Sequence, residues 1–318
     1  MAVYTDVNFE DLERLLALYD IGTPLSFKGI AEGVENSNFY LQTDRGAFIL
    51  TLYEKRVAEE DLPFFLGLME HMARKGIACP LPLRTRDGQQ LVTLNRRSAA
   101  ILTFLSGISL RRPGVPHCAA AGAVLAELHK AGEDFTLTRR NALGPPGWRP
   151  LAESIGDADS VEEGLTALIA GSLADLEAGW PQDLPGGVIH ADLFPDNVLF
   201  MKDDVSGVID FYFACNDFYA YDLAVMLNSW CFEMDGSYNI TKGQALIGAY
   251  RAHRPITQAE ADALPLLMQG AALRFLLTRT FDWINHDESW LVRPKDPREY
   301  ARKLRFHRKV KHAGEYGL

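Results

Sequence analysis

The apolar positions of this chain change their spacing about a third of the way along it. In the first part, short apolar runs of strand length alternate with turn residues such as Asp44-Arg45-Gly46 and Asp87-Gly88. These runs predict strands at residues 26–31, 37–43, 47–53 and 98–105, with further strands opening at 80–83. Helical spacing predicts a helix at 8–19 with Asn8 as its N-cap and another at 58–75 ending at Gly76.

Beyond residue 116 the apolar spacing is that of helices. Helices are predicted at residues 117–131, 160–178, 220–233, 241–253, 257–283 and 297–311. Ser160-Val161-Glu162-Glu163 has the pattern of a capping box, and Pro265 is expected to kink or split the helix that contains it. Residues 139–150 are rich in Pro and Gly and predict a loop, either an ordinary one or a substrate gate.

The two patterns together predict an α+β protein with two lobes. A small antiparallel-sheet lobe would span residues 1–106, and a larger, mostly helical lobe would span residues 107–318. A chain of 318 residues that is 47% hydrophobic is long enough for two separate cores. A strand-rich lobe joined to a helical lobe makes a cleft in which a nucleotide can bind.

Bulk properties exclude several classes of function. The net charge of −10 argues against sequence-independent nucleic-acid binding, which depends on neutralising phosphates. No apolar run reaches eighteen residues and no signal peptide is recognisable at the N-terminus, so we expect neither a membrane span nor secretion. Four cysteines without metal-binding spacing indicate reduced thiols in a cytoplasmic protein. The basic residues between Arg302 and Lys311 predict a solvated helix face, or alternatively a partner surface.

The most specific chemistry lies beside a predicted hairpin, in which residues 198–200 and 207–209 are strands joined by a turn at Asp203-Asp204. A further short strand is predicted at residues 187–189. The run His190-Ala-Asp192-Leu-Phe-Pro-Asp-Asn197 is followed by Asp210 at the end of an apolar strand. An Asp can orient an attacking hydroxyl, and an Asn and a second Asp supply oxygen ligands for Mg²⁺ on a nucleoside triphosphate. Asp192 is therefore the candidate catalytic residue, with Asn197 and Asp210 as candidate metal ligands. We expect Asp196 to be an exposed turn residue and His190 to be structural.

These residues resemble the catalytic and metal loops of the aminoglycoside-phosphotransferase-like branch of the protein-kinase-like superfamily. Within that branch the motif sequences are most similar to those of the type II homoserine kinases. The similar motifs are Gly33-Val-Glu-Asn-Ser-Asn-Phe39, Ile49-Leu-Thr-Leu-Tyr-Glu54 and the run that begins at His190. The resemblance covers about residues 20 to 285. It implies a protein-kinase-like fold with ATP and Mg²⁺ as cofactors and L-homoserine as the acceptor. The product would be O-phospho-L-homoserine, and the reaction would belong to threonine biosynthesis.

The resemblance also implies where ATP binds. The turn that begins at Glu32 would cover the nucleotide, and its backbone amides and polar side chains could bond phosphate oxygens. The implied cofactor-binding residues are Gly33, Glu35, Asn36, Ser37, Asn38 and, at the hinge that ends at Gly107, Thr103 and Phe104.

One position departs from the pattern of many relatives, which carry a Lys or Arg on the third strand paired with a Glu on the next helix. Here the strand has Thr51, and Phe65 falls near the position of the Glu. The joint absence of the cation and of the Glu is physically consistent, because the absence of only one of them would leave a buried charge unpaired. Lys55 or Arg56 could reach the phosphates instead.

Two arginines lie within an otherwise apolar helix and must find an anion there. Arg274 and Arg279 could bind the acceptor carboxylate, or each could form an internal salt bridge, for instance to Asp222 or Asp282. Truncating either to Ala would, on the first reading, raise the KM for homoserine. Tyr212, together with Asn228 and Trp230, could line the same pocket or simply pack there. Glu35, Asp217 and Asp282 are candidates to hold the ammonium group.

Other functions remain open on the sequence. The acceptor could be an aminoglycoside, choline or another amino alcohol, and a polycationic aminoglycoside would suit the acidic composition. A protein kinase is disfavoured because only about a dozen residues separate Asp210 from Tyr221-Asp222, too few for an activation loop. A nucleotide-binding pseudoenzyme is supported only by the missing Lys, since a protein that only binds has no use for a catalytic base.

Overall fold

The computed structural model describes residues 5–30, 36–54, 57–286 and 293–318. The described chain forms two compact units, one running up to Ser106 and the other from Gly107 onward. Each is considered by itself. The antiparallel sheet of the first unit and the helices of the second agree with the predicted α+β class.

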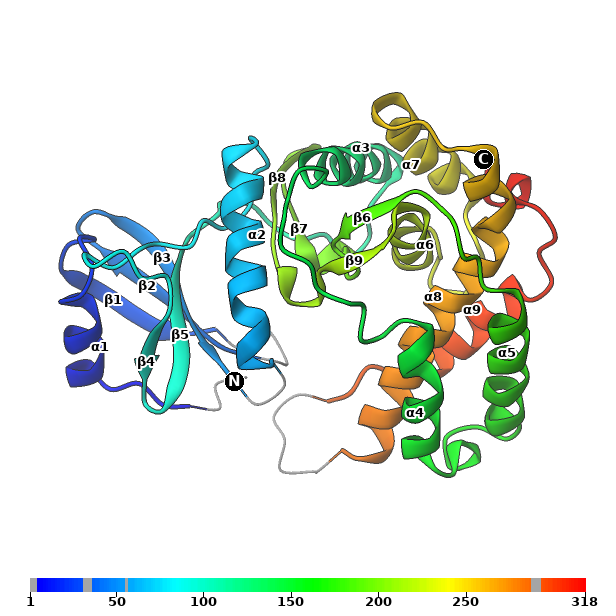
Figure 1. The fold of residues 1–318 in the computed structure, drawn as a ribbon, viewed down its shortest axis with the longest axis horizontal. Coiled ribbons are helices and arrows are strands. Elements are labelled where there is room, and N and C mark those ends of the chain that lie inside the picture. The colour runs from blue at the N-terminus through cyan, green and yellow to red at the C-terminus, as the bar shows by residue number, and fades with distance from the viewer. Residues whose placement is uncertain (1–4, 31–35, 55–56, 287–292) are drawn as a thin grey trace. The chain divides into compact units, whose positions relative to one another are not determined.

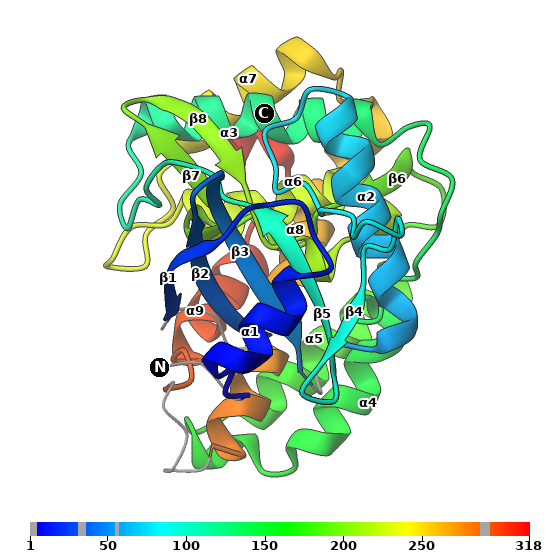
Figure 2. The same cartoon turned by 90° about the vertical axis from the view of Figure 1, so that its left-hand side faces the viewer.

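Unit 1 is a five-stranded antiparallel sheet in the order β1-β2-β3-β5-β4 (Figures 1 and 2). The strands are β1 (Pro24–Gly29), β2 (Asn36–Thr43), β3 (Gly46–Tyr53), β4 (Val92–Leu94) and β5 (Arg97–Thr103). Helix α1 (Phe9–Leu16) lies on one side of the sheet and α2 (Leu62–Arg74) on the other (Figure 1). The Asn8 side chain accepts a hydrogen bond from the backbone N–H of Asp11, so the predicted N-cap is confirmed. Leu50 and Leu52 of β3 are fully buried in the core that α1 covers.

Two details of unit 1 differ from the prediction. Residues 80–83 form no strand, and Pro82 makes only an isolated bridge to Leu102, because proline has no N–H to donate to a ladder. The tight hairpin turn lies at Asn95-Arg96, where both residues have positive φ (49° and 63°), and it joins β4 to β5. Asp87-Gly88 is a turn, but it joins no pair of strands in the described sheet.

Unit 2 is built around helix α6 (Tyr219–Trp230), in which all residues except Ser229 are buried. Helix α8 (Gln258–Ile284) packs against α6 and also against α4 (Pro145–Ile155), α5 (Leu165–Gly179) and α9 (Arg298–His307). Helix α3 (Val115–Ala131) packs along α7 (Ile240–His253). A side chain at Gly122 of α3 would collide with the Leu246 carbonyl of α7, so glycine permits this close approach.

Three helix predictions in unit 2 were wrong in detail. The Pro-rich segment is not all loop, because α4 begins at Pro145, and proline is tolerated in a first turn where N–H groups have no helical partner. Ser160 caps no long helix. It lies in a short 3-10 helix, and α5 begins only after Gly164, whose φ is +80°. Pro265 does not split α8, which runs unbroken for 27 residues.

Two short antiparallel pairs of strands carry the loops of interest. Strand β6 (Gly186–Ile189) pairs with β9 (Cys215–Phe218), which the sequence did not predict, and β7 (Val198–Met201) pairs with β8 (Asp204–Val208). The predicted hairpin between Val198 and Val208 is thus confirmed, and its register places Val198 opposite Val208. Among the described residues, no helix has the length and apolar character required to cross a membrane.

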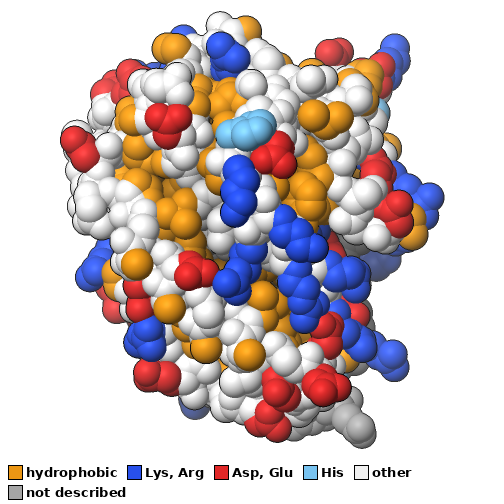
Figure 3. Space-filling model, turned by 90° about the vertical axis from the view of Figure 1, so that its right-hand side faces the viewer, with side chains coloured by type: hydrophobic (Ala, Val, Ile, Leu, Met, Phe, Trp, Pro, Cys, Tyr) orange, Lys and Arg blue, Asp and Glu red, His pale blue; other side chains and the backbone are white. Residues whose placement is uncertain are grey.

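The basic C-terminal segment is only partly a solvated face. Figure 3 shows Lys and Arg side chains gathered on this side of unit 2, among apolar and acidic ones. Helix α9 ends at His307, and both His307 and Lys303 are buried. The Lys303 ammonium donates to the Asn228 carbonyl of α6 (2.8 Å) and pairs with Glu299 (2.6 Å). This segment therefore fastens α9 to the central helix.

Burial of His307 makes folding sensitive to pH. Its Nε2 contacts the Asn228 amide oxygen (3.0 Å) and its Nδ1 contacts the Tyr316 hydroxyl (2.8 Å), so the ring is satisfied in its neutral form. Burial, and then the nearby Lys303 charge, lowers the pKa of His307 to about 3. Because this pKa lies below that of the unfolded chain, stability is present above about pH 6.5 and is lost as the pH falls toward the folded value.

We therefore predict that His307→Gln weakens the pH dependence of stability. Between pH 7 and pH 5 the wild-type free energy of unfolding should fall by about 2 kcal/mol more than that of the variant, because the unfolded histidine takes up a proton that the folded one refuses. Urea unfolding followed by tryptophan fluorescence measures the difference. Parallel pH profiles for the two proteins would contradict the prediction.

Candidate active site

A buried carboxylate in the first turn of α6 holds the loop that follows β6. Asp222 is fully buried, and its two oxygens accept the backbone N–H groups of His190 and Ala191 at 2.8 Å each. Burial opposes the charged form, but the hydrogen bonds from the His129 ring and from the His190 backbone N–H lower the pKa of Asp222. The carboxylate therefore remains ionised where the loop needs two strong acceptors.

A neutral histidine completes the environment of Asp222. His129 Nε2 lies 3.1 Å from the Asp222 carboxylate, and Nδ1 lies 2.8 Å from the Tyr250 hydroxyl. Because a carboxylate only accepts, Nε2 carries the proton and Nδ1 accepts from Tyr250. Burial lowers the pKa of His129, which agrees with a neutral ring. The loop after β6 is thus held by a continuous chain of hydrogen bonds through three helices, α3, α6 and α7.

Further bonds fix the path of the loop. Ala191 has a φ of +62°, a conformation that residues other than glycine rarely adopt. His190 Nε2 donates to the Ile209 carbonyl (3.1 Å), which confirms its predicted structural role beside the strand that leads to Asp210. The Trp230 indole donates to the Leu193 carbonyl (2.8 Å), so Trp230 is occupied by the backbone of the loop.

The three predicted chemical residues lie together in unit 2. The Asn197 amide nitrogen donates to the Asp192 carbonyl (2.8 Å) and to the Asp192 carboxylate (3.2 Å). The Ile209 N–H donates to the Asn197 carbonyl (3.0 Å), which brings the next residue, Asp210, beside this pair. Asp210 has left-handed backbone angles (φ 65°, ψ 64°) at the start of a short 3-10 helix. The side chain of Asp192 keeps 18% of its surface exposed, so a substrate can reach it.

The charges of this site are not balanced by the described residues alone. Burial raises the pKa of Asp192 to about 8, against the lowering effect of Arg274, and the charge of Asp210 raises it further. Burial also raises the pKa of Asp210 to about 6, against the backbone N–H of Tyr212. Two neighbouring, partly buried carboxylates with raised pKa values form a site that a bound cation would stabilise.

The donors suit Mg²⁺ better than a transition metal. The described residues hold no group of three or more His, Cys, Asp or Glu arranged to bind a metal. The side-chain nitrogen of Asn197 is bonded to Asp192, which leaves the side-chain oxygen of Asn197 as a metal ligand in addition to the Asp210 carboxylate. Mg²⁺ commonly takes one or two protein oxygens and completes its shell with water and phosphate oxygens. The residues present therefore fit this ion.

Arg274 lies beside the candidate catalytic residue. It is 2% exposed, donates to the Ala191 carbonyl, and places its Nη2 3.8 Å from the Asp192 carboxylate. The guanidinium lies 4.3 Å from the ring centre of Phe275 and 5.2 Å from that of Phe213. Its Nε is buried and has no hydrogen-bond partner. The internal partners suggested from the sequence, Asp222 and Asp282, are not the ones that the structure gives it.

Arg279 forms the internal salt bridge that the sequence left open, although with a different partner. Its guanidinium lies 2.7 Å from Glu299 of α9 and 4.4 Å from the ring centre of Tyr300. Asp196 is exposed and pairs with Lys295 at 3.2 Å, as expected of a turn residue. Tyr212 is half-buried, and its backbone N–H bonds Asp210.

Two of the other candidates for the acceptor pocket have side chains that already form hydrogen bonds within unit 2. The Asn228 amide donates to the Ala224 and Met268 carbonyls, joining α6 to α8. The Asp217 carboxylate accepts from Asn141 and from the Phe218 N–H, both at 2.7 Å.

In unit 1, the polar side chains at the start of β2 are turned toward their own sheet. The Ser37 hydroxyl donates to Glu54 (2.7 Å), and the Asn36 side-chain oxygen accepts the Glu54 N–H (3.4 Å). The Asn38 side-chain oxygen accepts from the Thr51 hydroxyl (2.8 Å), and Thr51 is buried. These three side chains of β2 are thus hydrogen-bonded to β3 or to Glu54, the residue that follows it. The position that carries Lys or Arg in many relatives here completes a neutral hydrogen bond.

Some candidates for nucleotide binding cannot be placed. Gly33, Glu35, Lys55 and Arg56 lie outside the described residues. At the end of β5, the Thr103 hydroxyl accepts the Leu81 N–H (2.9 Å), and the following Phe104 is 41% exposed with its ring edge against Tyr40. An exposed aromatic ring is a suitable surface for a base to stack on.

Sequence reasoning missed the residues that hold the loop. The sequence indicated Asp222 as part of a helix start and as a possible partner for an arginine, and it indicated no contact for His129 or Tyr250. A signal was present, because an Asp in a helix that is otherwise almost wholly apolar must find donors when it is buried. The sequence does not show which donors these are, since they come from residues 31 positions away or more.

Comparisons with known proteins agree with this geometry. The phosphotransferase enzyme family matches residues 26–256. A homoserine kinase of Xanthobacter autotrophicus is 61% identical, with 100% of this chain and 99% of the relative aligned, and one of a Methylobacterium species is 62% identical over the same shares. Among solved structures, an aminopropanol kinase superposes with a TM-score of 0.70 at 19% identity (98% and 99% covered). A spectinomycin phosphotransferase also gives 0.70, at 12% identity (98% of each).

The solved structures are too distant to show more than the fold, whereas the sequence relatives match from end to end. The protein therefore belongs to the phosphotransferase enzyme family, in the group of relatives that carry the name homoserine kinase.

Proposed function

We propose that this protein is an ATP:L-homoserine O-phosphotransferase, which transfers the γ-phosphoryl group of ATP to the hydroxyl of L-homoserine. Full-length identity of about 61% to homoserine kinases is the observation that carries the proposal. The meeting of Asp192, Asn197 and Asp210 in unit 2 supports it. The product, O-phospho-L-homoserine, would serve threonine biosynthesis, and buried free thiols agree with a cytoplasmic location.

Asp192 would align the acceptor hydroxyl and accept its proton. Its carboxylate is fixed by the Asn197 amide on one side and faced by Arg274 on the other. Arg274 lowers the pKa of Asp192 against the effect of burial, which favours the form that accepts a proton. Transfers of this kind depend on positioning and on charge neutralisation more than on covalent help. Mg²⁺, held by Asn197 and Asp210, would supply the neutralising charge for the phosphate oxygens.

Arg274 is the stronger of the two arginine candidates for the acceptor carboxylate. Its buried Nε has no partner, and a donor left unsatisfied in the interior costs free energy until a ligand accepts from it. Arg279 is already paired with Glu299. We infer that Arg274 binds the substrate together with Tyr212, and that Arg279 fastens α8 to α9.

ATP would bind to unit 1. The candidates are the amides of residues 31–35, which lie outside the described part, and the exposed Phe104 ring with the adjoining Thr103 backbone. A related acceptor, such as choline, an aminoglycoside or another amino alcohol, is the second candidate function. The fold is shared with kinases of several small molecules. ADP release measured over a panel of amino alcohols, antibiotics and sugars separates the two, and preference for an acceptor other than homoserine would reject the first.

We predict that Asp192→Asn lowers kcat at least 100-fold and leaves the affinity for ATP unchanged, because the amide cannot accept the hydroxyl proton. Coupled ADP release and a nucleotide-binding titration measure the two quantities. Asp204→Asn, on the exposed end of β8, is the matched control and should keep wild-type turnover. A variant at position 192 that retains more than a tenth of wild-type kcat would remove Asp192 from the catalytic role.

A second prediction concerns the cation. In the presence of ADP, added Mg²⁺ should raise the melting temperature of the wild type, because a ligand that binds only the folded state stabilises it. Asp210→Asn should abolish this increase, since the amide removes the charge that balances the ion, and Asp204→Asn should preserve it. Thermal unfolding with and without Mg²⁺ gives the comparison, and equal shifts in the two variants would contradict the assignment of Asp210.

A third prediction separates the two arginines. Arg274→Ala should raise the KM for homoserine and also move the acidic limb of the kcat profile to higher pH, because removing a nearby cation raises the pKa of Asp192. Arg279→Gln should change KM by less than threefold while lowering stability. Steady-state kinetics between pH 6 and 9 test both variants. An unchanged KM and pH profile for Arg274→Ala would exclude it from the acceptor site.

A further inference from the structure

The segment between α8 and α9 brings a lysine to the candidate active site. The ammonium group of Lys295 lies 3.2 Å from the Asp196 carboxylate and 5.5 Å from the ring centre of Phe194. Both of these partners lie in the stretch of the loop after β6 that joins Asp192 to Asn197. Two independent contacts therefore place this cation against the part of unit 2 that carries the chemical groups.

Aromatic packing relates Lys295 to the other cation of the site. The ring of Phe194 meets the ring of Phe275 edge to face, with 4.8 Å between their centres. The opposite neighbour of Phe275 is the Arg274 guanidinium, at 4.3 Å from the ring centre. Lys295 and Arg274 thus form the two ends of one chain of contacts, and they approach the loop at different points.

The charge of Lys295 acts on both candidate chemical carboxylates. Burial is the largest influence on Asp192 and on Asp210, and it raises the pKa of each. The Lys295 ammonium lowers both pKa values, after the stronger effect of Arg274 in the case of Asp192. A cation that favours the ionised form of both carboxylates is within electrostatic reach of any phosphate bound beside them.

Lys295 is also available to a ligand. Its side chain is 60% exposed and that of Asp196 is 59% exposed, and an ion pair so open to water adds little to stability. An ammonium group has three donors, so Lys295 can bind an incoming oxygen and still contact Asp196. Arg274, by contrast, is buried and already donates to the Ala191 carbonyl.

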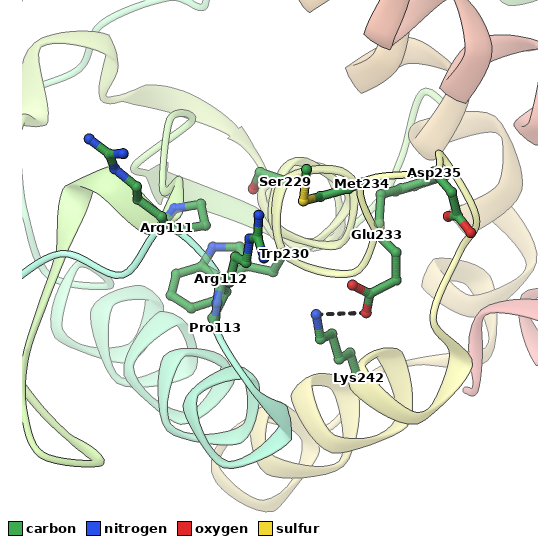
Figure 4. A pocket seen from close by; sticks show the side chains of 11 residues that line it. Arg111, Arg112, Pro113, Ser229, Trp230, Glu233, Met234, Asp235 and Lys242 are labelled. Atoms are coloured by element: carbon green, nitrogen blue, oxygen red, sulfur yellow. Dashed lines mark ion pairs between the residues drawn. The ribbon is translucent and has the colours of Figure 1, made fainter.

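Two basic side chains near the same turn do not offer a free charge to it. A cavity of about 410 Å³ borders Pro195 and includes Arg111 and Lys242 in its wall. Figure 4 shows Lys242 joined to Glu233, at 2.8 Å, and the Arg111 side chain directed away from the cavity. Lys295 is therefore better placed than either of them to meet an anion at the loop.

The proposed reaction requires such a cation. Negative charge lies on the phosphate oxygens during transfer, and positively charged groups stabilise it there. Strand β3, where many relatives carry a Lys or Arg, contains no basic residue, and its Thr51 hydroxyl is bonded to Asn38 at 2.8 Å.

We propose that Lys295 binds an oxygen of the γ-phosphoryl group and supplies from unit 2 the cation that β3 lacks. The proposal rests on the proposed function, since it adds a phosphate-binding residue to the same site. Asp196 holds the ammonium group beside the loop before the nucleotide binds.

The test compares two nucleotides on the full-length protein. Isothermal titration in the presence of Mg²⁺ measures the affinity for a non-hydrolysable ATP analogue and for ADP. Lys295→Met should lower the affinity for the analogue about tenfold and change that for ADP by less than about twofold, because ADP has no γ-phosphate. Lys295→Arg keeps the charge and should restore binding of the analogue. Lys309→Met, which removes an exposed cation beyond the end of α9, should change neither affinity.

Asp196→Asn distinguishes phosphate binding from a purely structural role. If Lys295 served only to tie its segment to the loop, breaking the ion pair from either side would have the same effect. The proposal instead expects Asp196→Asn to bind the analogue at least as tightly as the wild type, because a negative charge beside the phosphate is removed. Circular dichroism and the melting temperature establish that each variant is folded.

Three results would overturn the proposal. They are unchanged affinity for the analogue in Lys295→Met, equal losses in Lys295→Met and Asp196→Asn, and a raised KM for homoserine as the sole effect of Lys295→Met, which would assign Lys295 to the acceptor. Kinase activity of the wild type toward homoserine is measured separately. Its absence would reject the proposed function, while a loss of affinity confined to the triphosphate would still identify Lys295 as a γ-phosphate ligand.

Discussion

The candidate active site depends on one buried carboxylate. Asp222 accepts the N–H groups of His190 and Ala191, and the chain then reaches Asp192 in a backbone conformation that no local preference favours. An uncompensated charge at the centre of a helical unit would be costly, and the neutral His129 with Tyr250 behind it supplies the remaining hydrogen bonds. The catalytic loop and the helical core therefore stabilise each other, because neither half of this network is satisfied without the other.

Whether a polar group has a hydrogen-bond partner also distinguishes the structural residues of this protein from its candidate functional residues. Arg279, Lys303 and His307 are buried with full sets of partners, and they hold α9 against the core. Asp192 and Asp210 are instead partly buried beside each other, burial raises the pKa values of both, and Arg274 keeps a donor without an acceptor. Groups in such a state lower the free energy of unfolding, and binding of substrate and cation would offset that loss because it satisfies them.

The sequence predicted what depends on local patterns. The helix capped by Asn8 and the hairpin from Val198 to Val208 could be found because turn residues and the spacing of apolar residues mark them. The predictions failed where contacts with residues distant in the sequence determine the local structure or the partner of a side chain. β9 forms because it pairs with β6, α4 forms although three prolines lie within it, and the partner of Arg279 comes from a different helix. The roles of Asp222 and His129 likewise depend on contacts across 31 or more positions, which spacing cannot show.

The proposed phosphoryl transfer depends most on Asn197 and Asp210 sharing one divalent cation beside Asp192. Crystals grown with a non-hydrolysable ATP analogue and Mn²⁺ in place of Mg²⁺ would locate that ion by its anomalous scattering. We expect a single strong peak at about 2.1 to 2.3 Å from the Asn197 side-chain oxygen and from an Asp210 carboxylate oxygen. A cation bound by other residues, with Asn197 and Asp210 both outside its coordination shell, would contradict it.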